Sequence, residues 1–404
     1  MDFADTPEEA AYRDKAIAWL QANAPRGGLK ATREGGADLE KHRAYQAAKA
    51  AAGYAQITWP KEWGGPGGTP IQQVIFSQEE ARFDLYSAYF SIGLGMCLPT
   101  VIAFADAATT QRFAGPGLRG EHIWCQLFSE PSGGSEVAAA RTRAIRDGDD
   151  WVVNGQKIWT SGAHLSDFGI LLVRTNTEVP KHKGMTMFWV DMTSPGIEVR
   201  PIHQMSGQKG FNEVFFTDLR IPDSQRLGAV DDGWKVSLVT LMNERLSIGA
   251  GTAADHMSFI ELARQAVLDG ESALRDPAIR EKLADWYVQT EGLKHTRMRT
   301  ITALSKGQTP GPENSIAKII TARQAQDVGA EAVDMLDQFG IIQDPAIAPL
   351  RALFQDQWLA GPGSRIAGGT DEILRNIIAE RVLGLPGDIR VDKDVAFKDM
   401  PTGR

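Results

Sequence analysis

The sequence predicts a mainly helical protein with a central β domain. Helical periodicity runs from the first residues to about residue 120 and returns at Gly233, while short strand-like runs lie in between. The order helical, β, helical favours the layers of one enzyme over alternating βαβ units. We therefore expect an N-terminal helical domain at residues 1–120, a middle antiparallel β domain at 121–230 and a C-terminal helical bundle at 231–404.

The N-terminal domain begins with a helix-capping pattern. An Asp-Thr-Pro sequence at 5–7 predicts a helix start, and apolar periodicity continues to about Leu20. Gly and Pro residues in 59–70 predict a loop, which a second helix follows. The stretch 87–105 is apolar on nearly all sides, which predicts a buried helix.

The middle domain begins near His122, where the residue pattern changes from helical periodicity to short strand-like runs. Short runs rich in Val, Ile, Phe, Trp and Thr are separated by the turn sequences DGDD and NG. These runs are HIWCQLF, TRAIRD, WVVNGQKIWT, FGILLVRT, MTMFWVDM, IEVRPI and EVFFTDLRI. They predict strands joined by hairpin turns.

The C-terminal domain is predicted to consist of long helices. The stretch 233–269 suits one very long helix or two in series, and 276–307 and 311–340 suit one helix each. A Gly-Gly-Thr step at 368–370 then leads into an amphipathic helix. The backbone N–H groups at such a helix start point toward an electron-rich ligand.

Composition limits the function classes. The chain has 404 residues, enough for two or three domains, and a formal net charge of −8, so we expect no nucleic-acid partner. Its two cysteines are far apart in sequence, which fits a reducing compartment. The N-terminus lacks the pattern of a signal peptide and no stretch approaches 18 uncharged apolar residues. We expect a cytoplasmic protein with no membrane span.

Several common site motifs are absent or out of context. The GAGTAA stretch at 249–254 has the spacing of a dinucleotide-binding loop, but it follows a helical segment, so close helix packing is the better interpretation. The seven histidines are scattered without an HExxH pattern, and we predict no metal site. No GxSxG sequence supports a hydrolase triad.

Two segments carry a resemblance to a known family. The first is CQLFSEPSGGSEVAAARTRA with WVVNGQKIWTSGAHLSD after it, and the second is GGTDEILRNIIAERVLGLP. Together with WPKEWGG and the helical–β–helical order, they resemble the acyl-CoA dehydrogenase family over nearly the whole chain. The resemblance implies FAD held between the β domain and the C-terminal helices. It also implies α,β-desaturation of an acyl-CoA thioester.

The resemblance assigns roles to individual residues. The expected FAD contacts are Gln126, Phe128, Ser129, Trp159, Ser161, Thr370 and Glu372. Ser135 matches a serine that touches the CoA portion of the substrate. Without the resemblance, Trp159 would be an ordinary cross-strand aromatic and Ser135 a turn residue.

The catalytic base is the main departure from the family pattern. Many relatives carry a Glu directly before the Gly-Thr step, but Gly368 occupies this position and offers only its backbone N–H. A subset of the family, including the isovaleryl-CoA dehydrogenase type, places its Glu on another helix before an Arg. Glu244 and Arg245 fit that pattern, so we expect Glu244 to be the base, with Arg245 near it or near CoA. Asp371 and Glu372 remain fallback carboxylates.

Other family features are less clear in this chain. The DQFG sequence, with Phe339 and Gly340, resembles a loop that contacts FAD shared between subunits, but its usual second Gly is missing. Arg264 and Arg275 are both candidates for a contact to a neighbouring subunit's FAD. We expect a homodimer or homotetramer that passes electrons to an electron-transfer flavoprotein. The alternatives are an acyl-CoA oxidase or other flavin enzyme, and a non-catalytic subunit that binds FAD or CoA.

Overall fold

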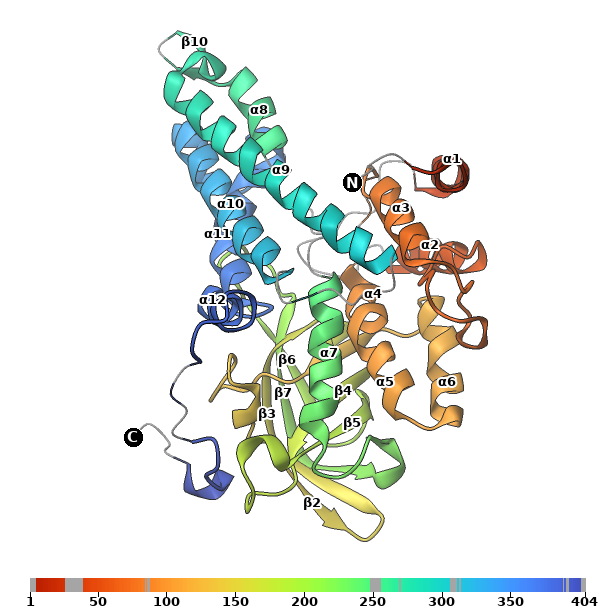
Figure 1. The fold of residues 1–404 in the computed structure, drawn as a ribbon. Coiled ribbons are helices and arrows are strands. Elements are labelled where there is room, and N and C mark those ends of the chain that lie inside the picture. The colour runs from red at the N-terminus through yellow and green to blue at the C-terminus, as the bar shows by residue number, and fades with distance from the viewer. Residues whose placement is uncertain are drawn as a thin grey trace. The chain divides into compact units, whose positions relative to one another are not determined.

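A computed structural model describes residues 5–25, 39–83, 85, 88–247, 256–268, 270–305, 311, 314–387, 389 and 392–400 (Figure 1). The chain divides into two compact units, the first formed by 1–247 with 388–404 and the second by 248–387. Helices precede and follow a central sheet along the chain, which confirms the predicted fold class. In the part of the chain that is described, no helix combines the length and apolar character that crossing a membrane requires.

The N-terminal part of the first unit is helical, as expected. Its helices are α1 (Pro7–Asn23), α2 (Leu39–Ala51), α3 (Pro70–Glu80), α4 (Ala88–Ile92), α5 (Leu98–Phe104) and α6 (Ala107–Leu118). Thr6 caps α1, because its hydroxyl accepts from the Glu9 N–H while the Glu9 carboxylate accepts from the Thr6 N–H. This capping box confirms the helix start predicted at residues 5–7.

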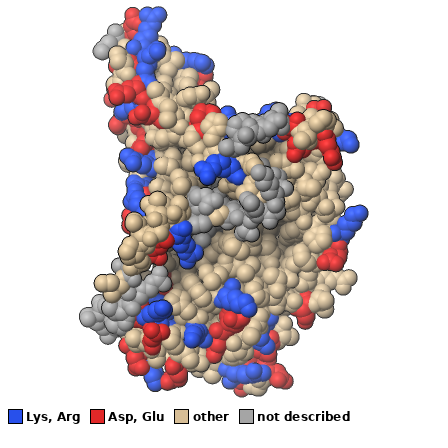
Figure 2. All heavy atoms as spheres, in the orientation of Figure 1, with Lys and Arg blue, Asp and Glu red and all other residues tan. Residues whose placement is uncertain are grey.

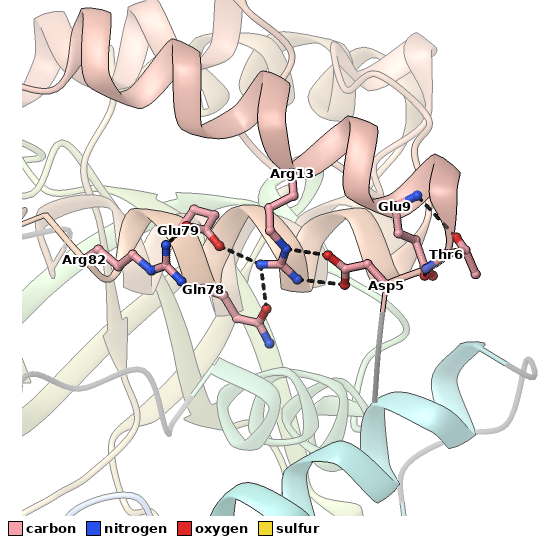
Figure 3. A network of polar contacts seen from close by, with 7 residues as sticks. All are labelled: Asp5, Thr6, Glu9, Arg13, Gln78, Glu79 and Arg82. Carbon is pink, nitrogen blue, oxygen red and sulfur yellow. Dashed lines mark hydrogen bonds and ion pairs between the residues drawn. The ribbon is translucent and has the colours of Figure 1, made fainter. Parts of the chain in front are cut away.

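A polar network joins α1 to α3 (Figure 3). The Arg13 guanidinium donates to Asp5, to Gln78 and, at 2.6 Å, to the buried carboxylate of Glu79. Arg82 pairs with the other oxygen of Glu79 at 2.7 Å. Because both oxygens face a guanidinium, the buried charge is compensated and the two helices stay in register.

Most described side chains of the apolar stretch 87–105 are buried or half-buried, but the stretch does not form the single helix that was predicted. A π-helical turn, η2 (Gly93–Cys97), lies between α4 and α5. Pro99 in the first turn of α5 has no N–H to donate to a carbonyl four residues earlier. The wider π turn, in which the Leu98 N–H donates to the Gly93 carbonyl, fits this missing donor.

The middle part of the first unit is an eight-stranded sheet with the order β6-β7-β3-β2-β4-β5-β8, in which β1 also pairs with β4. The strands are β1 (Trp124–Leu127), β2 (Arg143–Asp147), β3 (Asp150–Ser161), β4 (Phe168–Arg174), β5 (Met185–Asp191), β6 (Ile197–Ile202), β7 (Phe211–Pro222) and β8 (Arg226–Leu227). The antiparallel prediction is confirmed for most of these pairs, but β1 runs parallel to β4, and β2 also pairs with β4 in parallel, at Arg143 and Arg174. The β2–β3 hairpin separates β1 from β4 along the chain, which lets both strands run in one direction.

Helix α7 (Gly233–Ser247) also belongs to the first unit. It contacts β5, α5 and η2, and its Val236 and Thr240 side chains are buried. The Thr240 hydroxyl lies 2.8 Å from the Thr100 hydroxyl of α5. On the face shown in Figure 2, acidic and basic side chains are interspersed around the β2 end of this unit. No single-sign patch is seen there.

The second unit is a helical bundle. It contains α8 (His256–Gln265), α9 (Pro277–Ser305), α10 (Asn314–Met335), α11 (Leu353–Ile366) and α12 (Asp371–Ile377), together with a short hairpin of β9 (Val267–Leu268) and β10 (Glu271–Ser272) that was not predicted. Phe259, Trp286, Val328 and Phe354 lie in its core. The stretch 233–269 therefore contains two helices, and the GAGTAA stretch between them lies outside the described residues.

Candidate functional site

The residues singled out in the sequence lie on both units, and those of each unit are described separately. In the first unit, the segment after β1 is fixed by a buried ion pair. Lys157 is 0% exposed, and its Nζ lies 3.0 Å from the Phe128 carbonyl and 2.7 Å from Glu130 Oε1. Glu130 also accepts from the N–H groups of Arg141 at 2.6 Å and Thr142 at 2.9 Å. The Glu130 carboxylate thus closes the base of the loop 131–140.

The protonation of Glu130 follows from these contacts. Burial raises the pKa of this carboxyl, but the Lys157 ammonium and the N–H donors outweigh burial, so the pKa lies below its usual value. Glu130 is therefore ionised at neutral pH and poorly suited to accept a proton. Our sequence prediction missed this pair. The sequence nevertheless contained an indication of it. Lys157 is a charged residue whose position in β3 alternates in step with the buried Trp151 and Val153, so its side chain is expected to point inward.

Trp159 is placed by a β-bulge. The register between β3 and β7 shifts between Lys157 and Thr160, and Trp159 has a φ of 58°. Its side chain is 54% exposed and lies edge-to-face with Phe211, with 6.0 Å between ring centroids. A left-handed conformation costs a tryptophan about 1–2 kcal/mol. The folded unit therefore contains this backbone strain, and it exposes the indole ring of Trp159 on its surface.

The other predicted FAD contacts of the first unit lie around this bulge. The Ser129 carbonyl accepts from the Ile158 N–H at 2.9 Å, so the end of the β1 segment lies beside β3. Phe128 is buried, the Gln126 side chain is half-buried, and the half-buried Ser161 follows two residues after Trp159. The structure therefore brings all five predicted positions into one neighbourhood of the sheet.

Ser135 lies on the exposed part of the loop 131–140. A tight turn precedes it, in which the Gly133 N–H donates to the Glu130 carbonyl at 3.0 Å. Glu136, the next residue, places its carboxylate 3.2 Å from Lys181 Nζ. The Ser135 side chain is exposed.

In the second unit, the Gly-Gly-Thr step forms a left-handed turn before α12. Gly368 has a φ of 65° and Gly369 a φ of 93°, conformations that favour glycine. The Thr370 hydroxyl caps α12 by accepting from the Ile373 N–H at 3.2 Å. Lys318 Nζ donates to the Gly369 carbonyl at 2.8 Å. The predicted helix start is confirmed, and Lys318 is a second support that sequence reasoning missed.

Asp371 is held by two cations. Its side chain is almost fully buried, with Oδ2 2.7 Å from Arg365 Nε and Oδ1 3.7 Å from Lys318 Nζ. Arg365 also donates to the side chain of Gln326 at 3.2 Å. Asp371 is therefore a structural partner of Arg365 and Lys318. The Glu372 side chain is exposed.

A cavity of about 270 Å³ opens beside this turn within the second unit. Its lining residues are Gln326, Pro362, Arg365, Ile366, Thr370, Asp371 and Glu372. Two predicted FAD contacts, Thr370 and Glu372, are among them. The wall combines the Thr370 hydroxyl and the Arg365 guanidinium with two carboxylates, and Arg365 is already paired with one of them, Asp371.

Further candidate site residues are Glu244, Arg245, Arg264 and Arg275, and the structure describes only the last two of these side chains. Glu244 and Arg245 lie in the last turn of α7, but their side chains are outside the described residues. Arg264 pairs with Glu261 and Arg275 pairs with Glu271, both on the surface of the second unit. Neither arginine is favoured over the other by these contacts.

The DQFG sequence forms the 3-10 helix η8 (Asp337–Ile341). Phe339 is 45% exposed, and Gly340 is buried where a Cβ atom would lie 2.5 Å from the Val333 carbonyl oxygen. Among the described residues, no group of three or more His, Cys, Asp or Glu side chains is placed to hold a metal ion.

Comparisons with known families identify the whole chain. The N-terminal, middle and C-terminal domain families of acyl-CoA dehydrogenases match residues 6–121, 125–219 and 231–383, respectively. Acyl-CoA dehydrogenase IpdE1 of Mycobacterium tuberculosis is 37% identical, over 87% of this chain and 90% of its own length. Acyl-CoA dehydrogenase FadE34 of the same organism is also 37% identical over 84% of this chain, but the chain spans only 46% of that relative.

Solved structures agree with these matches. The Tcur3481-Tcur3483 steroid ACAD has a TM-score of 0.80 and 25% identity, over 96% of this chain and 100% of that one. The ChsE4-ChsE5 complex from Mycobacterium tuberculosis has a TM-score of 0.77, with the same identity and coverage. The chain belongs to the acyl-CoA dehydrogenase family of FAD-dependent enzymes, which dehydrogenate acyl-CoA thioesters.

Proposed function

We propose that this chain desaturates an acyl-CoA thioester between its α and β carbons, with Glu244 as the base. The observation that carries this proposal is Gly368. This residue occupies the place where many relatives carry the base, and its φ of 65° disfavours any side chain there. The α-proton must therefore go to a carboxylate elsewhere in the chain.

The sequence of α7 supports Glu244 as that carboxylate. Glu244 stands directly before Arg245, which is the Glu-Arg order that the resemblance to the isovaleryl-CoA dehydrogenase type implies for the base. The Gly368 N–H is proposed to donate to the thioester oxygen and so stabilise the negative charge that develops as the α-proton leaves. FAD, when bound, supplies the acceptor for the β-hydride at its N5 atom.

The remaining site residues are proposed to bind FAD and CoA. In the first unit we assign Gln126, Phe128, Ser129, Trp159 and Ser161 to the flavin. In the second unit we assign Thr370 and Glu372 to its phosphate and adenosine side, and Phe339 with Gly340 to FAD shared between subunits. Ser135 and Arg245 are assigned to the CoA portion of the substrate. The domain division 1–120, 121–230 and 231–404 is proposed with these roles.

The acyl group is proposed to be branched or to carry rings. A structure with 25% identity bears the name steroid ACAD, and a base on a separate helix suits a bulky acyl chain. That structure and the ChsE4-ChsE5 complex each combine two named proteins. We therefore keep a homodimer, a homotetramer and a hetero-oligomer as alternatives for the assembly. An electron-transfer flavoprotein is the proposed electron acceptor, and two buried free cysteines support a reducing, cytoplasmic location.

Bleaching of the flavin by acyl-CoA thioesters tests the reaction. Purified protein should be yellow, and a suitable branched or ring-bearing acyl-CoA should bleach it without oxygen. Glu244→Gln should slow bleaching about 10²- to 10⁴-fold while the colour and thioester binding remain. Glu198→Gln changes an exposed glutamate of β6 in the same way and should leave bleaching unchanged.

Each rival function has its own outcome in this assay. Rapid reoxidation of the reduced enzyme in air, with peroxide formed, would identify an acyl-CoA oxidase. Bound FAD that no thioester bleaches would identify a non-catalytic subunit. Full turnover in Glu244→Gln would exclude Glu244 as the base, and Asp371 and Glu372 would be tested next.

A further inference from the structure

The C-terminal segment, residues 392–400, packs against the β domain of the same unit (Figure 1). The Phe397 N–H donates to the Val179 carbonyl at 2.9 Å, and the Lys398 N–H donates to the Thr177 carbonyl at 3.1 Å. The Phe397 side chain is only 6% exposed. The segment is thus a packed part of the first unit, close in sequence to the chain's end.

A buried arginine joins the C-terminal segment to the loop 131–140. The Arg174 guanidinium lies 3.8 Å from the centroid of the Phe397 ring, and Arg174 is almost fully buried. The same guanidinium donates to the carbonyls of Ala138 at 2.6 Å and Ala140 at 3.2 Å. The Phe397 ring therefore covers the charge that holds the C-terminal end of the loop.

A second link runs through Lys181. Its ammonium lies 2.6 Å from Asp392 Oδ2 in the C-terminal segment and 3.2 Å from Glu136 Oε2 in the loop. Glu136 directly follows Ser135. Arg141, at the end of the loop, also places its guanidinium 5.4 Å from the centroid of the Phe397 ring. The side chains of Arg174, Lys181 and Arg141 thus connect the C-terminal segment to the loop 131–140.

We propose that the C-terminal segment positions the loop 131–140 for binding the CoA portion of the substrate. The inference rests on the proposed role of Ser135 and adds Phe397 and Asp392 as positioning residues. Ordering a loop costs free energy for each residue fixed. If the loop is ordered before the substrate arrives, this cost does not reduce the affinity for the substrate.

Two variants of the C-terminal segment test this role in the holoenzyme. Phe397→Ala removes the ring over Arg174, and Asp392→Asn weakens the link through Lys181. Each should raise the KM for acyl-CoA about five- to tenfold and change kcat less than about twofold, because uniform binding is lost. Phe397→Tyr, which keeps a ring over Arg174, should restore most of the KM. Lys398→Ala removes an exposed ion pair with Glu178 in the same segment and should behave like the wild type.

Hydrogen–deuterium exchange of the protein without substrate separates this inference from the proposed reaction. Peptides that cover 131–140 should exchange faster in Phe397→Ala and at the wild-type rate in Lys398→Ala. Unchanged exchange in this loop, or a KM that stays at the wild-type value, would overturn the inference. A kcat that falls with KM unchanged would also overturn it. Faster exchange in an enzyme whose wild type desaturates no thioester would instead contradict the proposed function alone.

Discussion

Lys157 Nζ and Glu130 Oε1 lie 2.7 Å apart, and both side chains are buried. This ion pair joins the middle of β3 to the segment that follows β1, where the predicted flavin contacts lie. Two backbone N–H groups also donate to the Glu130 carboxylate. Removal of one member leaves a buried charge without compensation, whereas removal of both does not.

The first prediction follows from the difference between removing one member of the ion pair and removing both. Glu130→Met should lower the free energy of unfolding by about 3–5 kcal/mol, because Lys157 is left buried and unpaired. The double variant Glu130→Met, Lys157→Met should recover a large part of that loss. Asp147→Asn breaks an exposed pair with Arg220 and should cost at most about 1 kcal/mol. Urea unfolding of the four proteins measures these differences, and a double variant as unstable as Glu130→Met would contradict the prediction.

The same pair predicts a loss of stability in acid. The pKa of Glu130 is lowered from its ordinary value of 4.5, with the Lys157 ammonium and hydrogen bonds outweighing burial. For a carboxyl with a lowered pKa, the folded state binds fewer protons than the unfolded state, so stability is present above pH 4.5 and is lost as the pH falls through the folded pKa. The wild type should therefore lose more stability than the double Met variant when the pH is lowered below this value. Thermal unfolding from pH 7 to pH 3 checks the prediction, and parallel pH profiles would refute it.

Much of the fold followed from periodicity, because helical and strand patterns are local. The capping box at Thr6, the change of texture at His122 and the helix start at Thr370 all rest on neighbouring residues. The π turn at Gly93–Cys97 and the parallel β1–β4 pair were not predicted, because they depend on contacts between distant segments.

The site was predicted unevenly for the same reason. Motif residues such as Trp159 and Ser135 could be named from the resemblance, but the side chains that support them come from elsewhere in the sequence. Lys318 reaches Gly369 from a different helix, and Arg174 reaches the loop 131–140 from β4. Such supports carry no local motif, although a charged residue at an inward position of a strand, like Lys157, is a usable signal.

Trp159 provides a prediction in which binding and stability change in opposite directions. Trp159→Gly relieves a left-handed φ of 58°, which should stabilise the apoprotein by up to about 1–2 kcal/mol. The loss of the ring should weaken FAD binding about five- to tenfold if the indole contacts the flavin. Unfolding of the apoprotein and a flavin fluorescence titration measure the two effects.

The matched control for this variant is Asp218→Gly. Asp218 also has a positive φ, of 48°, and lies in β7 away from the β1 segment. It should change stability without any effect on FAD affinity. If Trp159→Gly left FAD binding unchanged, the assignment of Trp159 to the flavin would be wrong.

The last prediction concerns a variant that places a general base at the Gly-Gly-Thr turn. Gly368→Glu in the Glu244→Gln background places a carboxylate beside Gly369, the position at which the family resemblance implies a base in many members. The left-handed φ of 65° makes the new side chain cost about 1–2 kcal/mol, so recovery should be partial. Anaerobic bleaching should be about tenfold faster than in Glu244→Gln alone, because a general base is again available.

Gly368→Gln in the same background carries the same backbone cost without a base, and it should not recover. If both double variants recovered equally, proton acceptance at this position would not explain the effect. If neither recovered, the Gly368 turn would not lie close enough to the substrate's α-carbon for a side chain there to act.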